Sequence, residues 1–129
     1  MYGFSVKVSG DFNEVIGRVT EELKGEGFGV LTEIDVAATL KAKLGLEKRP
    51  YKILGACNPK LANQAIEAEP DIGLLLPCNV VVRQEEDGSN VVGFMDPVAV
   101  LGLVGREELA SLGAEVRSKL ERVRDALQG

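Results

Sequence analysis

Tyr51-Lys52-Ile53-Leu54-Gly55-Ala56-Cys57-Asn58-Pro59 and Pro77-Cys78-Asn79-Val80-Val81-Val82 are the two stretches around which the sequence is organised. Each predicts a strand, and a helix between them begins at Asn58-Pro59, where Asn caps and Pro takes the first helical position. If the strands are antiparallel neighbours, the end of the first and the start of the second lie at one edge of the sheet. Cys57 and Cys78 would then meet although 21 residues separate them.

The flanking sequence predicts the remaining elements from its periodicity. Apolar residues alternate in residues 2–8, and further strands are expected at 28–34 and 91–95. Asp11 and Asp35 precede helical patterns that end near Gly25 and Gly45. In the last helix, apolar residues recur at intervals of three and four. They are Leu109, Leu112, Val116, Leu120, Val123 and Leu127.

The order of these elements predicts an α+β fold. We expect one domain, residues 1–129, with a curved antiparallel five-stranded sheet, two long helices on one face in the order β-α-β4-α, and two short inserted helices. In the inserted helix that begins at Asn58, the expected buried stripe is Leu61, Ala62, Ala65 and Ile66. Asp87-Gly88 predicts a two-residue hairpin turn, which would place Val82 opposite Gly93 and Asn79 opposite Asp96.

The composition of the chain disfavours several classes of binding partner. The net charge is −5, which disfavours nucleic acid and anionic lipid as partners. No apolar run approaches the ~20 residues that span a bilayer, and the amino terminus alternates like a strand instead of resembling a signal peptide. We therefore expect a cytoplasmic protein without a membrane partner. Because the chain has no histidine, the commonest general base and the commonest zinc ligand are both missing.

Several segments together resemble a known family. They are Leu31-Thr32-Glu33-Ile34-Asp35, Pro50-Tyr51 with the strand that ends at Asn58-Pro59, residues 72–82, and Met95-Asp96-Pro97. These segments closely resemble a prokaryotic family known as domain of unknown function 302, over nearly the whole chain. The resemblance implies a fold similar to half of the TATA-box-binding protein. It brings no catalytic residues, and a shared fold does not by itself imply DNA binding.

The candidate site is the sheet edge where Cys57, Asn58, Cys78, Asn79 and Asp96 are expected to gather. We expect it to serve a small ligand- or partner-binding module. An alternative is thiol-dependent redox or soft-metal chemistry, with Cys57 as nucleophile and Cys78 as resolving thiol. A third is a structural domain in which both cysteines are ordinary buried residues. Two cysteines cannot complete a tetrahedral zinc site, so we expect no structural metal and no cofactor.

A second group joins Glu33 and Asp35 to Arg49 and Tyr51. Paired carboxylates serve as acid and base when their environments separate their pKa values. Here both lie two residues apart on one strand, beside basic residues, so a helix cap plus an ion pair is the favoured interpretation.

The strands also predict self-association. Residues 80–82, 53–54 and 91–92 are apolar toward both faces of the sheet, whereas the helices cover only one face. A homodimer that buries at least ~1,000 Å² would cover the other face.

Overall fold

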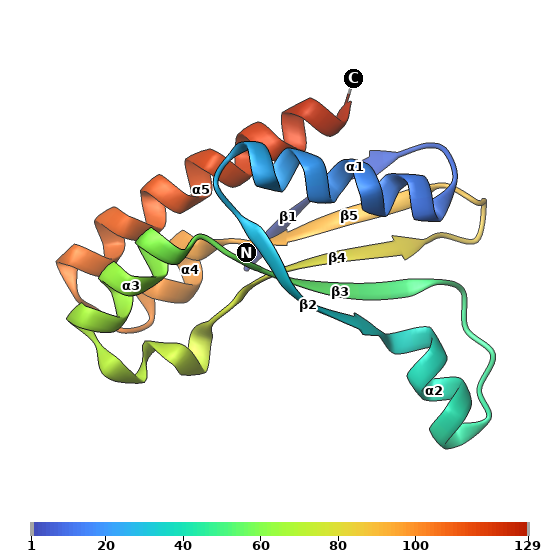
Figure 1. Ribbon diagram of the computed structural model, residues 1–129, viewed down its shortest axis with the longest axis horizontal. Helices are drawn as coiled ribbons and strands as arrows, with labels where there is room; N and C mark the ends of the chain where they lie inside the picture. The colour runs from blue at the N-terminus through green and yellow to red at the C-terminus, as the bar shows by residue number, and fades with distance from the viewer. Residues whose placement is uncertain (1, 129) are drawn as a thin grey trace.

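The central pair of strands, β3 (Tyr51–Cys57) and β4 (Cys78–Gln84), is antiparallel as predicted, with Ile53 opposite Val81 and Ala56 opposite Cys78. The computed structural model describes residues 2–128 and is shown in Figure 1. Met1 and Gly129, which the expected domain includes, lie outside the described residues. The pairing brings together both cysteine-bearing ends, so the predicted meeting of these ends is confirmed.

Three further strands complete the sheet: β1 (Gly3–Val8), β2 (Gly29–Asp35) and β5 (Asn90–Met95). Their order is β1-β5-β4-β3-β2, and every neighbouring pair is antiparallel. The fold is therefore α+β with the expected five-stranded open sheet. β2 and β1 are its edge strands, and β2 contains an irregularity between Val30 and Thr32.

Two long helices, α1 (Phe12–Gly25) and α5 (Glu107–Gln128), pack on one face of this sheet (Figure 1). The Asp11 carboxylate accepts from the backbone N–H groups of Asn13 and Glu14, which starts α1 where the sequence predicts it. All six apolar residues of the predicted α5 stripe are buried. These residues and the strand residues that face them form the core, because packing the helices on the sheet removes the apolar surface of both from water.

Four shorter helices occupy the connections: α2 (Val36–Leu44), α3 (Pro59–Ala68), the 3₁₀ helix η1 (Pro70–Leu75) and α4 (Pro97–Gly102). The sequence predicts α2 and α3, but η1 and α4 arise in apolar runs for which it indicates no helix. The predicted stripe of α3 is wrong at Ile66, which is 44% exposed, whereas Leu61 and Ala65 are buried. Ile66 lies on the outer side of α3, whose inner side is formed by Leu61 and Ala65.

The hairpin between β4 and β5 corrects the predicted register by one residue. Gln84 lies opposite Asn90 and Val82 opposite Val92, so the loop has three residues between Glu85 and Ser89. Gly88 has φ +88°, the left-handed conformation that closes a three-residue hairpin loop. The Asp87 carboxylate accepts from both the backbone N–H and the hydroxyl of Ser89, and this local hydrogen bonding favours the longer loop.

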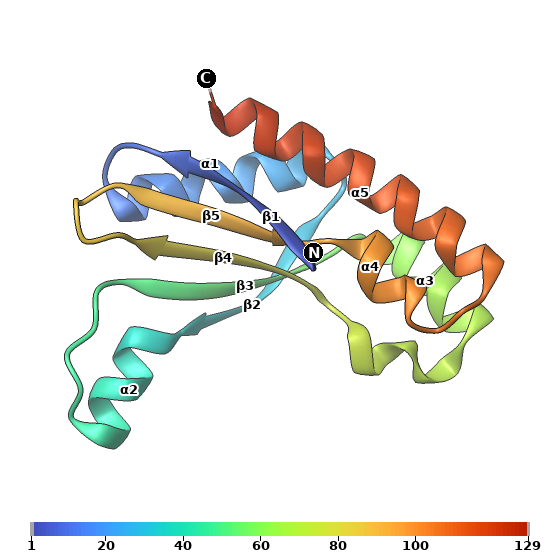
Figure 2. The same ribbon diagram turned by 180° about the vertical axis from the view of Figure 1, so that it is seen from behind.

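No helix within residues 2–128 packs flat on the second face of the sheet. In Figures 1 and 2, which look from opposite sides, α1 and α5 lie above the strands while α2 and η1 project below them. α2 precedes the start of β3 and η1 precedes the start of β4, so the two project from opposite ends of these antiparallel strands. We call this second side of the sheet the open face.

Candidate functional site

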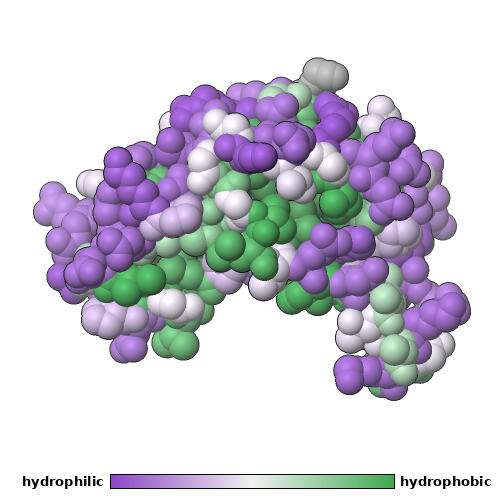
Figure 3. Space-filling view, viewed as in Figure 1, coloured by the Kyte–Doolittle hydropathy of each residue, from purple (hydrophilic) through white to green (hydrophobic). Residues whose placement is uncertain are grey.

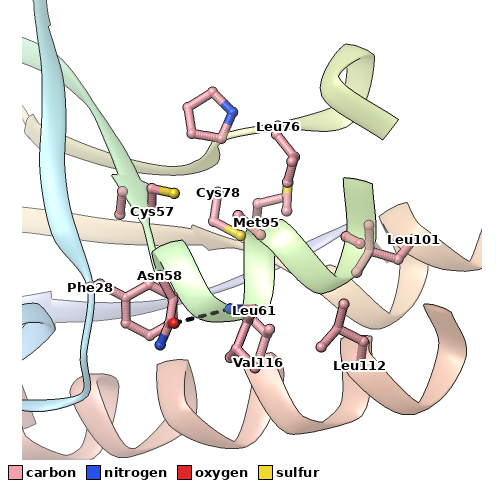
Figure 4. A pocket seen from close by; sticks show the side chains of 14 residues that line it. Phe28, Cys57, Asn58, Leu61, Leu76, Cys78, Met95, Leu101, Leu112 and Val116 are labelled. Carbon is pink, nitrogen blue, oxygen red and sulfur yellow. Dashed lines mark hydrogen bonds between the residues drawn. The ribbon is translucent and has the colours of Figure 1, made fainter. Parts of the chain in front are cut away.

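The end of β3 and the start of β4 open into a pocket beside α3 and α5, drawn in Figure 4. Cys57, Asn58 and Cys78 all line it, so three of the five predicted site residues come together. The remaining lining is apolar and includes Phe28, Leu112 and Val116. The cavity volume is about 30 Å³, enough for about one water molecule.

Asn58 is held by its capping role. Its Oδ1 accepts from the backbone N–H of Leu61 at 3.3 Å, as the dashed line in Figure 4 shows. Its Nδ2 lies against Gly27, where a Cβ would approach that nitrogen to 2.9 Å. Asn58 is therefore fixed between the start of α3 and the turn after α1, and its side chain is not free to reorient toward a ligand.

The two thiols differ in the element that positions them, because Cys57 ends β3 whereas Cys78 begins β4. Burial raises the pKa of the Cys78 thiol to about 11, and the neighbouring Cys57 contributes to the same increase. The thiolate, not the thiol, is the nucleophile and the metal ligand. Near neutral pH, Cys78 therefore behaves as a protonated, weakly polar wall of the pocket.

Asn79 and Asp96 lie outside this pocket. Asn79 is exposed and lies opposite Gly55, on the side of the sheet away from Cys78. A Cβ at Gly55 would collide with the hydroxyl oxygen of Thr32 and lie 3.0 Å from Cγ of Pro77, so only glycine fits between these side chains. Alternation along β4 separates Cys78 from Asn79, and the sequence alone had placed both at one site.

Asp96 has a structural environment of its own. Its carboxylate accepts from the backbone N–H of Val98 at 2.9 Å and pairs with Arg117 of α5 at 2.5 Å, and only 6% of the residue is exposed. Arg117 and Arg124 in turn lie over the ring of Phe4, at 5.3 and 5.4 Å from its centroid. These contacts tie the start of α4 and the edge strand β1 to α5.

Sequence reasoning missed the lining residues that belong to other elements. Met95, Leu101, Leu112 and Val116 line the pocket from β5, α4 and α5. The periodic stripe of α5 identified Leu112 and Val116 as buried, but it gave no indication that they lie beside the cysteines. That proximity depends on how α5 crosses the end of the sheet.

The second predicted group, around Glu33, consists of a helix cap and an ion pair, which is the interpretation that the sequence favours over an acid–base pair. The Asp35 carboxylate accepts from Ala38 at 2.9 Å and so caps α2, while Glu33 pairs with Lys52 at 2.7 Å. The hydrogen bond to Glu33 raises the pKa of Lys52. Arg49 instead donates to the carbonyl oxygen of Gln84. A polar cleft of about 530 Å³ lies nearby between α2 and the start of α1.

The open face has a defined pattern because the strand register is known. One row runs straight across all five strands: Ile34, Ile53, Val81, Gly93 and Ser5. On one side of it lies the row Tyr51, Arg83, Val91 and Lys7, and on the other lies the row Thr32, Gly55 and Asn79. The expectation of two apolar faces is therefore correct for the middle of the sheet, whereas the outer rows of the open face are largely polar.

Within residues 2–128, no group of three or more histidine, cysteine or acidic residues is placed to hold a metal ion. None of the helices in the described part of the chain is long and apolar enough to cross a membrane.

Comparison with known proteins identifies the family. No curated protein matches the chain. A crystal structure of an uncharacterized conserved protein of the family from Bacillus stearothermophilus is 35% identical, covers 98% of this chain and 98% of its own, and superposes with a TM-score of 0.91. The model of the family described as domain of unknown function DUF302 matches residues 4–127. Because this match spans nearly the whole sequence, the chain belongs to the DUF302 family.

Proposed function

We propose that this protein is a small binding module that acts as a homodimer, with a second copy of the chain covering the open face of the sheet. The observation that carries the proposal is the central row of that face. Ile34, Ile53 and Val81 form a continuous apolar row on the side opposite α1 and α5, and Ile34 is 50% exposed. Covering such a row with a like surface removes apolar area from water on both copies at once.

The runs around residues 72–76 and 98–104 do not provide this cover. Ile72 and Leu101 are buried in the core, but Leu74 and Leu103 are 85% and 77% exposed. The helices η1 and α4 that these runs form pack against α3 and α5 at the end of the sheet, so they do not cover the open face. They also add apolar surface near the rim, and clustered exposed apolar residues are typical of interaction surfaces.

Sedimentation equilibrium at micromolar concentration tests the proposal. The wild-type chain should sediment at twice its mass of 13.8 kDa. Val81→Glu places a charge at the centre of the proposed contact. This variant should sediment as a monomer, and its circular dichroism spectrum should match that of the wild type. Ile53→Lys is a second variant at the same row. Ser118→Glu, on the exposed side of α5, is the matched control and should remain dimeric. A wild-type protein that sediments as one chain contradicts the proposal.

A second candidate is a small apolar ligand in the Cys57–Cys78 pocket. Its apolar lining and its opening toward the surface favour it, although the volume of about 30 Å³ is far below the ~300–1,000 Å³ of drug-sized sites. Dissolved xenon should shift the NMR signals of the Met95, Leu112 and Val116 methyl groups. Ala62→Leu, which fills the pocket wall, should abolish the shifts. Unchanged methyl signals at saturating xenon would exclude the ligand.

Thiol chemistry is not the proposed function. As resolving thiol, Cys78 would have to form a thiolate readily, yet its pKa is raised to about 11. Of the interpretations that the sequence leaves open, the binding module therefore has the better physical support.

A further inference from the structure

Among the helices of residues 2–128, α2 alone has no buried side chain. It is nine residues long, and Leu44 at its end is 66% exposed. Isolated helices of this length are marginal in water and usually gain their stability by packing an apolar side. Figure 3 shows a hollow on the underside of the molecule, between the lobe at the lower right that holds α2 and the part at the lower left. The helix therefore presents apolar surface, above all at Leu44, that no other element of residues 2–128 buries.

The charges at the two projecting elements are opposite. The segment of α2 and the turn after it, residues 36–49, carries Lys41, Lys43, Lys48 and Arg49 against the single acid Glu47. The segment from the end of α3 through η1 carries Glu67, Glu69 and Asp71, and no basic residue occurs between Lys60 and Arg83. Arg106 pairs with Glu69 at 3.9 Å, so Glu67 and Asp71 are the acids of this segment that take part in no ion pair within residues 2–128. Exposed leucines accompany both segments, Leu44 in the first and Leu74 in the second. The two ends of the open face are thus complementary to each other in charge and alike in apolar character.

When the strands of the two copies are aligned, two open faces can meet around a two-fold axis in two ways. An axis along the strands leaves each end where it is, so α2 would meet the partner's α2, basic against basic. An axis across the strands reverses the ends, so each α2 would meet the partner's η1, basic against acidic. Like charges placed against each other at an interface cost several kcal/mol, whereas complementary charges select the register.

The shape of the open face favours the same axis. An axis along the central row of Ile53 and Val81 exchanges the two outer rows between copies. The bulky side chains of Tyr51 and Arg83 would then lie over the partner's small row of Thr32, Gly55 and Asn79. An axis along the strands would instead place the rows of Tyr51 and Arg83 of the two copies against each other, and two bulky rows in contact give poor shape complementarity.

We propose, resting on the homodimer above, that its two-fold axis runs across the strands and that α2 of each copy packs on η1 of the other. The apolar residues at Leu44 and Leu74 lie within this second contact, and the basic and acidic side chains surround it. α2 is therefore an arm that recognises a second copy of the chain, and the pairing of arm with η1 determines which way round the copies bind.

Charge reversal tests the inference without disturbing the described ion pairs. Lys43 and Lys48 on the arm, and Glu67 and Asp71 beside η1, take part in no ion pair within residues 2–128. The arm variant is Lys43→Glu with Lys48→Glu, and the η1 variant is Glu67→Lys with Asp71→Lys. Each should raise the dimer dissociation constant about tenfold or more, measured by sedimentation velocity at low salt. In the quadruple variant, which combines all four substitutions, the charges of both segments are exchanged. Its dimer dissociation constant should return to within about threefold of the wild-type value.

A matched control reverses two charges on the helix-covered side, Lys24→Glu with Lys119→Glu, and should leave the dissociation constant unchanged. If the wild type dimerises and Val81→Glu dissociates it, but the arm variant binds as well as wild type or more tightly, the proposed homodimer stands and the arm contact is wrong. A quadruple variant whose dissociation constant stays as high as that of the arm variant would also overturn the arm contact. A monomeric wild type overturns both proposals together.

Discussion

Helices α5 and α2 belong to the same chain but relate to its core in opposite ways. α5 has 22 residues and buries one side along its whole length, whereas α2 has nine residues and buries none. α2 begins and ends where local sequence directs it, with the Asp35 cap at one end and Gly45 with φ +68° at the other. Good capping therefore determines where a helix forms, but not whether the fold gives it a packing partner.

The difference also separates stability from recognition. A residue on the buried side of α5 contributes to the free energy of folding of one chain, because it fills the core. A residue on α2 contributes little to that free energy, and the proposed homodimer would use it to bind a second copy. Four predictions, ordered from the largest expected effect to the smallest, test this division.

Leu120→Ala should cause the largest loss. Leu120 lies in the middle of α5 and is fully buried, so its truncation removes apolar contacts and leaves a cavity. The free energy of unfolding should fall by about 2–5 kcal/mol, measured by urea denaturation at a fixed chain concentration. Ser118→Ala on the exposed side of the same helix should change it by less than about 0.5 kcal/mol. Equal losses from both variants would show that α5 is not packed as described.

Asp96→Ala should cost about 3 kcal/mol, because it leaves Arg117 without its partner and removes the cap of α4. Asp96→Asn should cost less, since an amide oxygen still accepts from the N–H of Val98. Thermal denaturation of both variants gives the comparison. Asp125→Ala, which removes an exposed partner of Arg124 on α5, is the control and should lie near wild type. If Asn proves as damaging as Ala, the ion pair with α5 is the main contribution and the cap a minor one.

Cys78 should make stability depend on alkaline pH. Its pKa is about 11 in the folded chain against 9.0 for an unperturbed thiol, so the folded state retains the proton that the unfolded state loses first. The contribution of this group is complete below pH 9 and is lost as the pH rises to 11, a decrease of about 2–3 kcal/mol.

The decrease is measured as the difference between wild type and Cys78→Ala in urea denaturation across this pH range, because other groups titrate in both proteins. The alkylation rate of Cys78 by iodoacetamide should rise over the same interval. Alkylation already complete near pH 8 would contradict the raised pKa.

Leu44→Ala should have the smallest effect on a single chain. Introduced into the Val81→Glu background, which is expected to be monomeric, it should lower the free energy of unfolding by less than about 0.5 kcal/mol, since Leu44 is largely exposed. In the wild-type background it should weaken the dimer. A monomer loss as large as that of Leu120→Ala would show that α2 packs on its own chain, and the contrast between the two helices would fail.

The sequence by itself determined the elements that depend on short-range patterns. The spacing of apolar residues gave α5 and its buried side, and the caps at Asp11, Asp35 and Asn58 gave the starts of three helices. The composition of residues 51–57 and 78–84 also indicated the strands β3 and β4, whereas their pairing was only a condition that the structure met. These features are predictable because each rests on side chains and backbone groups within one or two turns of each other.

Only the tertiary structure decided which residues share a site. A loop one residue longer than predicted, closed by Gly88, shifted β5 against β4, and alternation separated Asn79 from Cys78. Asp96 met Arg117, 21 residues along the chain, instead of the cysteines. The raised pKa of Cys78 required burial beneath elements far away in the sequence. No local pattern encodes such contacts, because they arise from the packing of whole helices and strands against one another.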